Sequence, residues 1–518
     1  MLIEHNVVQK DPRKVDVRFA SCYPNLYKTA MSSLGYHVIY DFLNSRQDIY
    51  CERVVYPYYK SLESNTALNK FDIVGFSLQY EQDYFNVLSM LDKVNIPIRS
   101  KDRTPTDPLI IAGGPCATSN PLPMSKFIDL FIVGEAEEII DELIDKYMEL
   151  DDPRKDIGEF MDIEGVYVPD NPVKRVIVRD MDKACHPIRQ VVPETDDKRF
   201  IPAFGRSFLL GVSRGCARGC RFCMSGYLYR PRRETSLKKI LKIAEKGRNA
   251  TGLDKIALIG AAVSDYSKID DLAQGLLDRD FKLTTPSLRI ETVTENFLES
   301  LHASGLKTIT LAPESTALIR KCLNKDISDE NIFDVSKIAF QRNMNIKYYF
   351  LIGTPGESLK DLEEMLDLIK NLRKSAPRKN MVKLSFNPLI PKPHTPFQWE
   401  RFNFEDMKSK INFINKNLGY KSFKIENLKG AYIQYVLSLG GSKTGDLIEK
   451  SWKTRINLKE WKNYGNNIIY DLETNLPWKN IDVKIRDDFI KNESKKMYRA
   501  EITRWCEEYG CYQCGTCI

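Results

Sequence analysis

Two short groups of cysteines constrain this chain more than any other feature of its sequence. They hold seven of the twelve cysteines, at the spacings C-x3-C-x2-C and C-x4-C-x2-C-x2-C. Thiols grouped this closely are typical of metal sites when a chain is not exported. The first group is Cys216, Cys220 and Cys223, and the second is Cys506, Cys511, Cys514 and Cys517. The sequence therefore predicts two metal sites.

The start of the sequence carries no sign of export. Residues 1–14 are charged throughout and lack the apolar core of a secretory signal. No apolar run approaches the ~20 residues that a membrane-spanning helix needs. We therefore expect a cytoplasmic protein without membrane contact, whose reduced thiols are available to ligate metal.

Length and composition indicate a folded chain of several units. The 518 residues exceed one compact core, since a domain usually has ~100–200 residues. Hydrophobic residues at 42% and charged residues at 28% exclude a disordered chain. The net charge of +7 is too small for a general nucleic-acid binder, although basic residues are in excess beyond residue 400.

Residues 1–164 alternate strand-like and helix-like segments. The expected strands are 15–20, 72–78, 108–114 and 130–136, and the first helix begins near Tyr27 and buries Met31, Leu34, Val38 and Phe42. This pattern predicts a Rossmann-like, doubly wound parallel sheet. Such sheets bind ligands at the carboxyl ends of their strands, and a nucleotide-like or corrinoid ligand suits this one. The residues at those ends are Ser77, Gly113, Gly114, Gly134 and Glu135, and glycines that simply form turns are the alternative.

The rest of the chain divides into three further parts. Residues 165–206 hold five prolines and are expected to connect domains. Between 207 and 400, the segments FLLGVS, KIALIGA, SLRIETV, TITLAPE, IKYYFLIG and VKLSFNPLI alternate with helices. This order predicts a partial (β/α)6 TIM-type barrel with its chemistry at the carboxyl ends of the strands. Residues 401–518 are expected to form a mostly helical domain with a cysteine-rich tail.

The internal cysteine group favours an iron–sulfur cluster over zinc. Three thiolates can hold a cubane cluster and leave one iron open for a substrate. A structural zinc site normally uses four protein ligands, and no fourth Cys or His follows nearby. A zinc knuckle or three incidental thiols are the alternatives.

This motif, with Phe222 before its third cysteine and a strand before its first, resembles that of the radical SAM superfamily. The resemblance implies a [4Fe–4S] cluster whose open iron binds S-adenosylmethionine. An electron from the cluster would then release a 5′-deoxyadenosyl radical, which removes hydrogen from an unactivated carbon.

The resemblance also implies residues that hold S-adenosylmethionine. Gly260, Ala261 and Ala262 stand where the family usually has Gly-Gly-Glu, so the acid is missing, and Ser264 and Asp265 are the candidates to replace it. Further positions at strand ends are Ser287, Arg289, Glu314 and Gly353. An ion pair that only lines the barrel mouth is the alternative for Arg289 and Glu314.

The N-terminal part resembles the cobalamin-binding domain of class B radical SAM methyltransferases. The matching positions are Ser21, Cys22, Asn25, Ser77, Leu78, Gly113, Gly114, Gly134 and Glu135. The D-x-H-x-x-G loop that supplies a lower histidine to cobalt in many corrinoid proteins is missing, and His37 is expected to be an ordinary packed residue. The resemblance thus implies cobalamin without a lower histidine.

Three other features are candidates for binding. Arg230, Arg232 and Arg233 have the forked donors that hold carboxylate or phosphate, although such groups are often solvated. His394, in P-K-P-H-T-P-F-Q-W, is more typical of barrel closure than of substrate contact. The four tail cysteines suit iron, zinc or a second cluster, and a metal-free tail is the alternative.

These features together favour a cobalamin-dependent radical SAM methyltransferase that acts on an unactivated carbon of a protein or small molecule. A low-potential donor such as ferredoxin or flavodoxin would reduce its cluster, and nucleic acid is not expected as a partner. A methylthiotransferase or other tRNA-modifying enzyme is one alternative. A non-catalytic iron–sulfur sensor or assembly factor is another.

Overall fold

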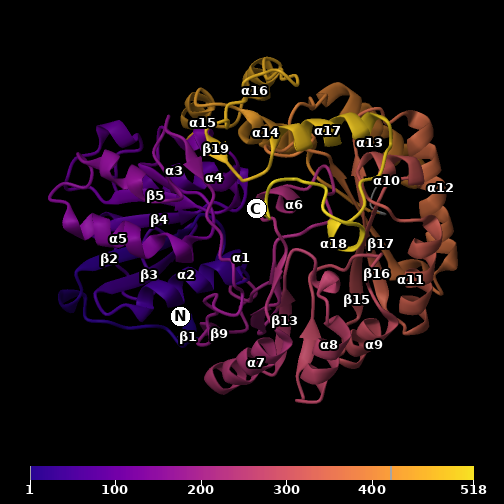
Figure 1. Cartoon of the computed structure of the whole chain (residues 1–518), viewed down its shortest axis with the longest axis horizontal. Helices are drawn as coiled ribbons and strands as arrows, with labels where there is room; N and C mark the ends of the chain where they lie inside the picture. The colour runs from indigo at the N-terminus through magenta and orange to yellow at the C-terminus, as the bar shows by residue number, and fades with distance from the viewer. Residues whose placement is uncertain (1, 420–422, 518) are drawn as a thin grey trace.

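Two α/β regions lie side by side, and a helical third region runs along one side of both (Figure 1). The computed structural model describes residues 2–419 and 423–517. The tail, yellow in Figure 1, returns from the helices to the middle of the molecule. The expected mixed α/β class with parallel sheets is therefore confirmed.

The N-terminal region is a six-stranded sheet in the order β3-β2-β4-β5-β6-β7. Its first five strands pair in parallel, and β7 is antiparallel to β6. The bounds are β2 Val17–Tyr23, β3 Ile49–Val55, β4 Ile73–Ser77, β5 Leu109–Gly113, β6 Leu130–Ile132 and β7 Val166–Tyr167. The sequence analysis missed β3, although all seven of its residues are buried.

The expected helix from Tyr27 is in two pieces. Helix α1 is Tyr27–Ala30, and α2 is Leu34–Ser45. Ser33 precedes α2 in an extended conformation and so restarts the helix in a new direction. Helix α2 buries Tyr36, His37, Val38, Tyr40 and Leu43. Of the predicted residues, Met31 and Val38 are buried, and Leu34 and Phe42 are half-buried.

The second region has two parallel sheets. One is β10 Phe208–Gly211, β13 Lys255–Ile259 and β14 Lys282–Thr284, and the other is β15 Thr308–Glu314, β16 Asn345–Ile352, β17 Val382–Pro388 and β18 Lys424–Ile425. Helices α7 Leu237–Thr251, α8 Ile269–Leu277, α9 Glu295–Ala303, α11 Asp329–Gln341 and α12 Leu359–Ser375 alternate with them. The order agrees with the expected partial barrel, but the sheet is divided after the third strand.

The prediction of a strand over residues 287–293 is wrong. The third strand is β14, which ends before Pro286, and an isolated bridge pairs Leu288 of the following loop with Leu311 of β15. The Arg289 N–H donates to the side chain of Ser264, 3.0 Å away, instead of to a neighbouring strand. This segment is therefore a loop, and it carries polar side chains towards the cysteine motif.

The C-terminal region is mostly helical, as expected. Its helices are α13 Phe404–Leu418, α14 Leu428–Leu439, α15 Thr444–Ser451, α16 Leu458–Gly465, α17 Asp487–Tyr498 and α18 Cys506–Tyr509. Helix α14 contacts the N-terminal region, since Gln434 Nε2 donates to Glu81 Oε2 at 2.8 Å. None of the helices that the structure describes is both long and apolar enough to cross a bilayer.

Candidate functional site

The cysteine motif occupies a buried loop that follows β10 and the short strand β11 Ser213–Arg214. Gly215 has a φ of +78°, and a Cβ there would lie 2.1 Å from the Tyr229 carbonyl oxygen. Only glycine fits such a position, so the chain can turn directly into Cys216. Cys216 and Cys220 are then 8% and 6% exposed.

The three thiols form one electrostatic group. Burial raises the pKa of Cys216 to about 12, the Arg289 charge opposes this shift, and the Cys220 and Cys223 thiols add to it. Burial and the Cys220 thiol likewise raise the pKa of Cys223. Among the described residues no three Cys, His, Asp or Glu side chains are placed to hold a metal ion as they stand.

The donors nevertheless fit an iron–sulfur cluster. Two buried thiols and one half-buried thiol on one short loop would be costly to ionise without a cation, and a metal supplies that cation. The Arg289 guanidinium adds charge from outside the loop, with Nη1 3.9 Å from Cys220 Sγ.

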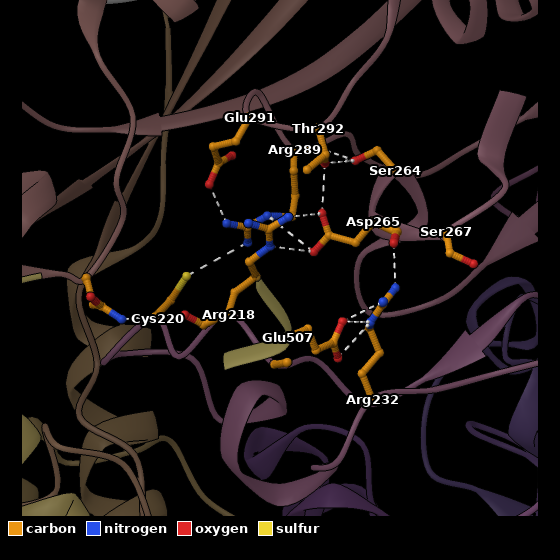
Figure 2. A network of polar contacts seen from close by, with 12 residues as sticks. Arg218, Cys220, Arg232, Ser264, Asp265, Ser267, Arg289, Glu291, Thr292 and Glu507 are labelled. Carbon is orange, nitrogen blue, oxygen red and sulfur yellow. Dashed lines mark hydrogen bonds and ion pairs between the residues drawn. The ribbon is translucent and has the colours of Figure 1, made fainter. Parts of the chain in front are cut away.

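Asp265 is the centre of a polar network beside this loop (Figure 2). Its carboxylate accepts from Arg218 Nε and Nη2 at 2.9 and 3.0 Å, and from Thr292 Oγ1 at 2.8 Å. Arg289 Nε lies 3.7 Å from the same carboxylate. The network therefore ties the cysteine loop to the loop after β14.

Some predicted S-adenosylmethionine residues come together here. Ser264, Asp265 and Arg289 meet beside Cys220, and Gly260 lines the cavity described below. Glu314, at the end of β15, is paired with Lys325 Nζ at 2.7 Å.

The remaining predicted S-adenosylmethionine residues, Ser287, Gly353 and Phe222, take no part in this network. Ser287 is exposed. Gly353 has a φ of +88° and donates to Glu357, and a Cβ on it would lie 2.2 Å from Met407 Cε. Phe222 packs against an apolar group made of Ile319, Leu323, Leu389, Phe397 and Met497.

A cavity of about 500 Å³ lies between the N-terminal sheet and the start of the second region. Its walls from the second region include Gly215 and Gly260. Six of the predicted cobalamin residues line it, namely Ser21, Ser77, Gly113, Gly114, Gly134 and Glu135. Cys22 and Leu78 are instead buried in the core, and Asn25 Nδ2 donates to Asp83 Oδ1 at 2.8 Å.

Glu135 joins the two regions at the cavity. It accepts from Arg233 Nη2 at 2.8 Å and from Arg214 Nη1 at 3.1 Å. Burial alone would raise the pKa of Glu135, but the two guanidinium groups hold it below its usual value. Arg214 lies two residues before Cys216, so this carboxylate fixes the cavity against the cysteine loop.

His186 also lines the cavity, and the sequence analysis missed it. Its Nε2 accepts from the Gly211 N–H at 3.1 Å, and burial lowers its pKa to about 4. The lone pair of Nε2 is therefore used within the protein. His37 is packed as predicted, with Nε2 3.2 Å from the Met31 carbonyl oxygen.

The cysteine-rich tail lies against the cysteine loop. Tyr512 donates from its hydroxyl to the Ala217 carbonyl oxygen at 2.8 Å, and Arg218 lies 3.7 Å from the Trp505 ring centroid. Arg232 Nη2 donates to Glu507 Oε2 at 2.6 Å. Arg232 and Arg233 thus hold protein carboxylates rather than a solvated surface.

Of Arg230, Arg232 and Arg233, Arg230 has the fewest hydrogen-bond partners among the described residues. It is 2% exposed, and neither Nη1 nor Nη2 has an oxygen or nitrogen acceptor among the described residues. Its guanidinium lies 5.1 to 5.7 Å from the ring centroids of Tyr227, Phe489 and Tyr512. Burial opposes its charge, but Tyr512, Tyr227 and then Cys514 raise the pKa of Arg230 above its usual value. Burial works against ionisation of the Cys514 thiol, yet hydrogen bonds from Thr516 and the Arg230 charge keep the pKa of Cys514 below its usual value.

His394 has a structural role. Its Nε2 lies 2.9 Å from the Ser119 carbonyl oxygen, and burial lowers its pKa to about 4.

Comparisons with known proteins match most of the chain. The model described as "Radical SAM proteins, N-terminal" matches residues 35–169, and the model described as "Radical SAM superfamily" matches residues 210–369. The uncharacterized protein MJ0966 of Methanocaldococcus jannaschii is 33% identical over 441 residues, which cover 83% of this chain and 90% of that protein. An uncharacterized methyltransferase of Pyrococcus horikoshii, PH0819, is 23% identical over 51% of this chain and 58% of its own length.

A solved structure has a similar fold. It is the radical S-adenosylmethionine methyltransferase TsrM from Kitasatospora setae, with cobalamin and a [4Fe-4S] cluster bound. The TM-score is 0.51 at 14% identity, over 76% of this chain and 75% of that one. At this identity the likeness is one of fold.

Proposed function

Because this chain belongs to the radical SAM superfamily, we propose that it is a cobalamin-dependent radical SAM methyltransferase acting on an unactivated carbon. When bound, the iron–sulfur cluster and S-adenosylmethionine supply a hydrogen-abstracting radical, and cobalamin supplies the methyl group. A ferredoxin or flavodoxin is the proposed electron donor. The acceptor is a protein or a small molecule.

The cavity is the observation that carries this proposal. The same cavity is lined by Ser77 and Gly113 of the N-terminal sheet and by Gly215, the residue before Cys216. A group seated on the sheet would thus face the mouth at which the cysteine loop lies. Methyl transfer from one cofactor to a carbon activated by another requires this adjacency.

The protein's own residues would position the cofactors. Glu135 pairs with Arg214 and Arg233, and so fixes the position of the cavity wall relative to the cysteine loop. Cys216, Cys220 and Cys223 would hold the cluster, while Arg289 balances thiolate charge. His186 does not offer Nε2 to cobalt, in keeping with cobalamin that lacks a lower histidine.

Anaerobic purification followed by iron, sulfide and cobalt analysis tests the proposal. We expect about four irons at the cysteine loop and a corrinoid spectrum at about one per chain. A reconstituted protein that cleaves S-adenosylmethionine but has no affinity for cobalamin would contradict the methyltransferase proposal.

We also propose that the tail cysteines hold a metal, because Arg230 has no carboxylate partner among the residues that the structure describes. Arg230 Nε donates to the Gly226 carbonyl oxygen, but a buried guanidinium without an anionic partner costs several kcal/mol, and a metal–thiolate centre is negatively charged. Arg230 has three aromatic rings around it and Cys514 beside it. The tail sulfurs do not converge as they stand, so binding would draw the loop together.

Metal analysis of a Cys514→Ser variant tests this second site. We expect loss of the tail's zinc or iron with the iron of the first cluster retained. Cys322→Ser, at a half-buried cysteine outside both groups, is the control. An unchanged metal content in Cys514→Ser would refute the site.

A further inference from the structure

Asp265 already accepts hydrogen bonds from protein side chains on both of its carboxylate oxygens. Oδ1 accepts from Arg218 Nη2 and Thr292 Oγ1, and Oδ2 accepts from Arg218 Nε with Arg289 Nε 3.7 Å away. Its side chain is 1% exposed. The acid that the sequence offers in place of the missing Gly-Gly-Glu glutamate is therefore already committed to holding two loops together.

Glu291, by contrast, has one carboxylate oxygen that makes no hydrogen bond to the described residues. Its Oε1 accepts from Arg289 Nη2, whereas its Oε2 is buried and has no hydrogen-bond partner among the described residues. A buried carboxylate oxygen without a donor costs free energy, so such an atom points to a donor supplied by a ligand.

The position of Glu291 identifies which part of a ligand that would be. Arg289 reaches Glu291 through Nη2 and Cys220 Sγ through Nη1, so both lie at the same end of one guanidinium (Figure 2). Glu314, the other predicted acid, is already paired with Lys325. A ligand amino group that approaches the cysteine loop would thus meet Glu291 Oε2 as its acceptor.

We propose that Glu291 accepts the hydrogen bond from the amino group of the methionine part of S-adenosylmethionine. This inference rests on the binding of S-adenosylmethionine at the cysteine loop, which is part of the proposed function. Glu291 does what the missing motif glutamate would do, from the loop after β14 instead of from the end of β13. Asp265 is a positioning residue that holds Arg218 and Arg289.

Two ligands separate this role from a structural one. S-adenosylhomocysteine carries the amino acid part, and 5′-methylthioadenosine lacks it. We expect Glu291→Gln to weaken binding of S-adenosylhomocysteine to the anaerobic, cluster-loaded chain by about tenfold or more. Binding of 5′-methylthioadenosine should stay within about twofold of the unmodified protein.

Glu295→Gln provides the matched control, since Glu295 is an exposed residue nearby whose carboxylate pairs with Arg342. It should leave the affinity for both ligands unchanged. Glu291→Asp, which keeps the charge on a side chain one methylene shorter, should also weaken S-adenosylhomocysteine selectively and covers the case in which Glu291→Gln folds poorly.

The inference is overturned if both Glu291 variants bind S-adenosylhomocysteine normally, or if they lose both ligands equally. A protein without cobalamin affinity would refute the methyltransferase proposal and leave this result intact. The two failures are therefore distinguishable.

Discussion

The candidate site has two parts that differ in how they are built: the sheet wall, which lines the cavity, and the charged wall, which is the polar network beside Cys220. The wall from the N-terminal sheet is rich in glycine and small residues, among them Gly75, Gly113 and Ser77. The wall beside Cys220 is made of paired charges, centred on Asp265 and Arg289. In the proposed function, the first would hold the large cobalamin by shape and the second would hold the polar part of S-adenosylmethionine by charge.

The difference extends to how each wall is held in place. The sheet wall depends on backbone pairing between parallel strands. The charged wall lies on loops, and side-chain ion pairs and hydrogen bonds fix their positions. Substitutions should therefore affect the two walls separately.

The largest expected effect is on the charged wall alone. Replacing Cys216, Cys220 and Cys223 together by Ala should abolish formation of 5′-deoxyadenosine and remove the cluster iron. Cobalamin affinity should persist, because the sheet wall is untouched. Iron analysis, product chromatography and a corrinoid binding titration check both statements, and continued cleavage of S-adenosylmethionine would refute the cluster assignment.

The second largest effect is expected for Arg221, the residue that anchors the cysteine loop. Arg221 is fully buried, pairs with Glu493 at 3.0 Å and donates to the Glu501 carbonyl oxygen. Arg221→Met removes the guanidinium from Glu493 Oε2 and from the Glu501 carbonyl oxygen, while Lys496 still pairs with Glu493 Oε1 at 3.1 Å. We expect the free energy of unfolding to fall by about 1.5–3 kcal/mol. Chemical unfolding of the second region measures this loss.

Arg279→Met serves as the comparison for that anchor. Arg279 pairs with Glu245 at 2.7 Å on the surface, and such pairs contribute about 0–1 kcal/mol. Equal losses in the two variants would contradict the anchoring role of Arg221.

A smaller effect is expected on the sheet wall. Ser77→Phe puts a ring into the cavity and should weaken cobalamin binding by about tenfold or more, with cleavage of S-adenosylmethionine unchanged. Ser77→Ala, which leaves the cavity open, should bind normally. Loss of both activities in Ser77→Phe would show that the walls are not independent.

The smallest effect concerns pH. The pKa of His186 is about 4 when folded and about 6.5 when unfolded, so its contribution to stability is complete above pH 6.5 and is lost as the pH falls towards 4. Between pH 7 and 5.5 this one group should cost about 1 kcal/mol. Unfolding curves of His186→Gln should show a shallower pH dependence, and an identical slope would contradict it.

Sequence patterns predicted the strands made of apolar residues and missed the strand that contains charged residues. The apolar strands β4 and β5 were evident, whereas β3 was missed because Glu52 and Arg53 interrupt it. Those charges are buried with partners distant in sequence, including Arg18 and Glu4. A strand of this kind cannot be identified before its partners are known.

The residues of the candidate site likewise divide into those that sequence patterns could predict and those that they could not. The cysteine spacing and the strand-end positions Ser77 and Gly113 were accessible to sequence. The pairing state of Asp265 and Glu291 was not, because both acids look alike in a sequence. Only the directions of Arg218 and Arg289 distinguish a committed carboxylate from an open one.

The sequence by itself therefore determined the superfamily, the parallel α/β class and the three thiols, since each depends on local spacing or periodicity. Within the described part of the chain, the tertiary structure decided which glycines face one cavity, which arginine has no carboxylate partner, and which acid near the cysteine loop has an oxygen without a hydrogen bond. These are matters of side-chain direction and partnership between segments far apart in the chain, which local sequence does not specify.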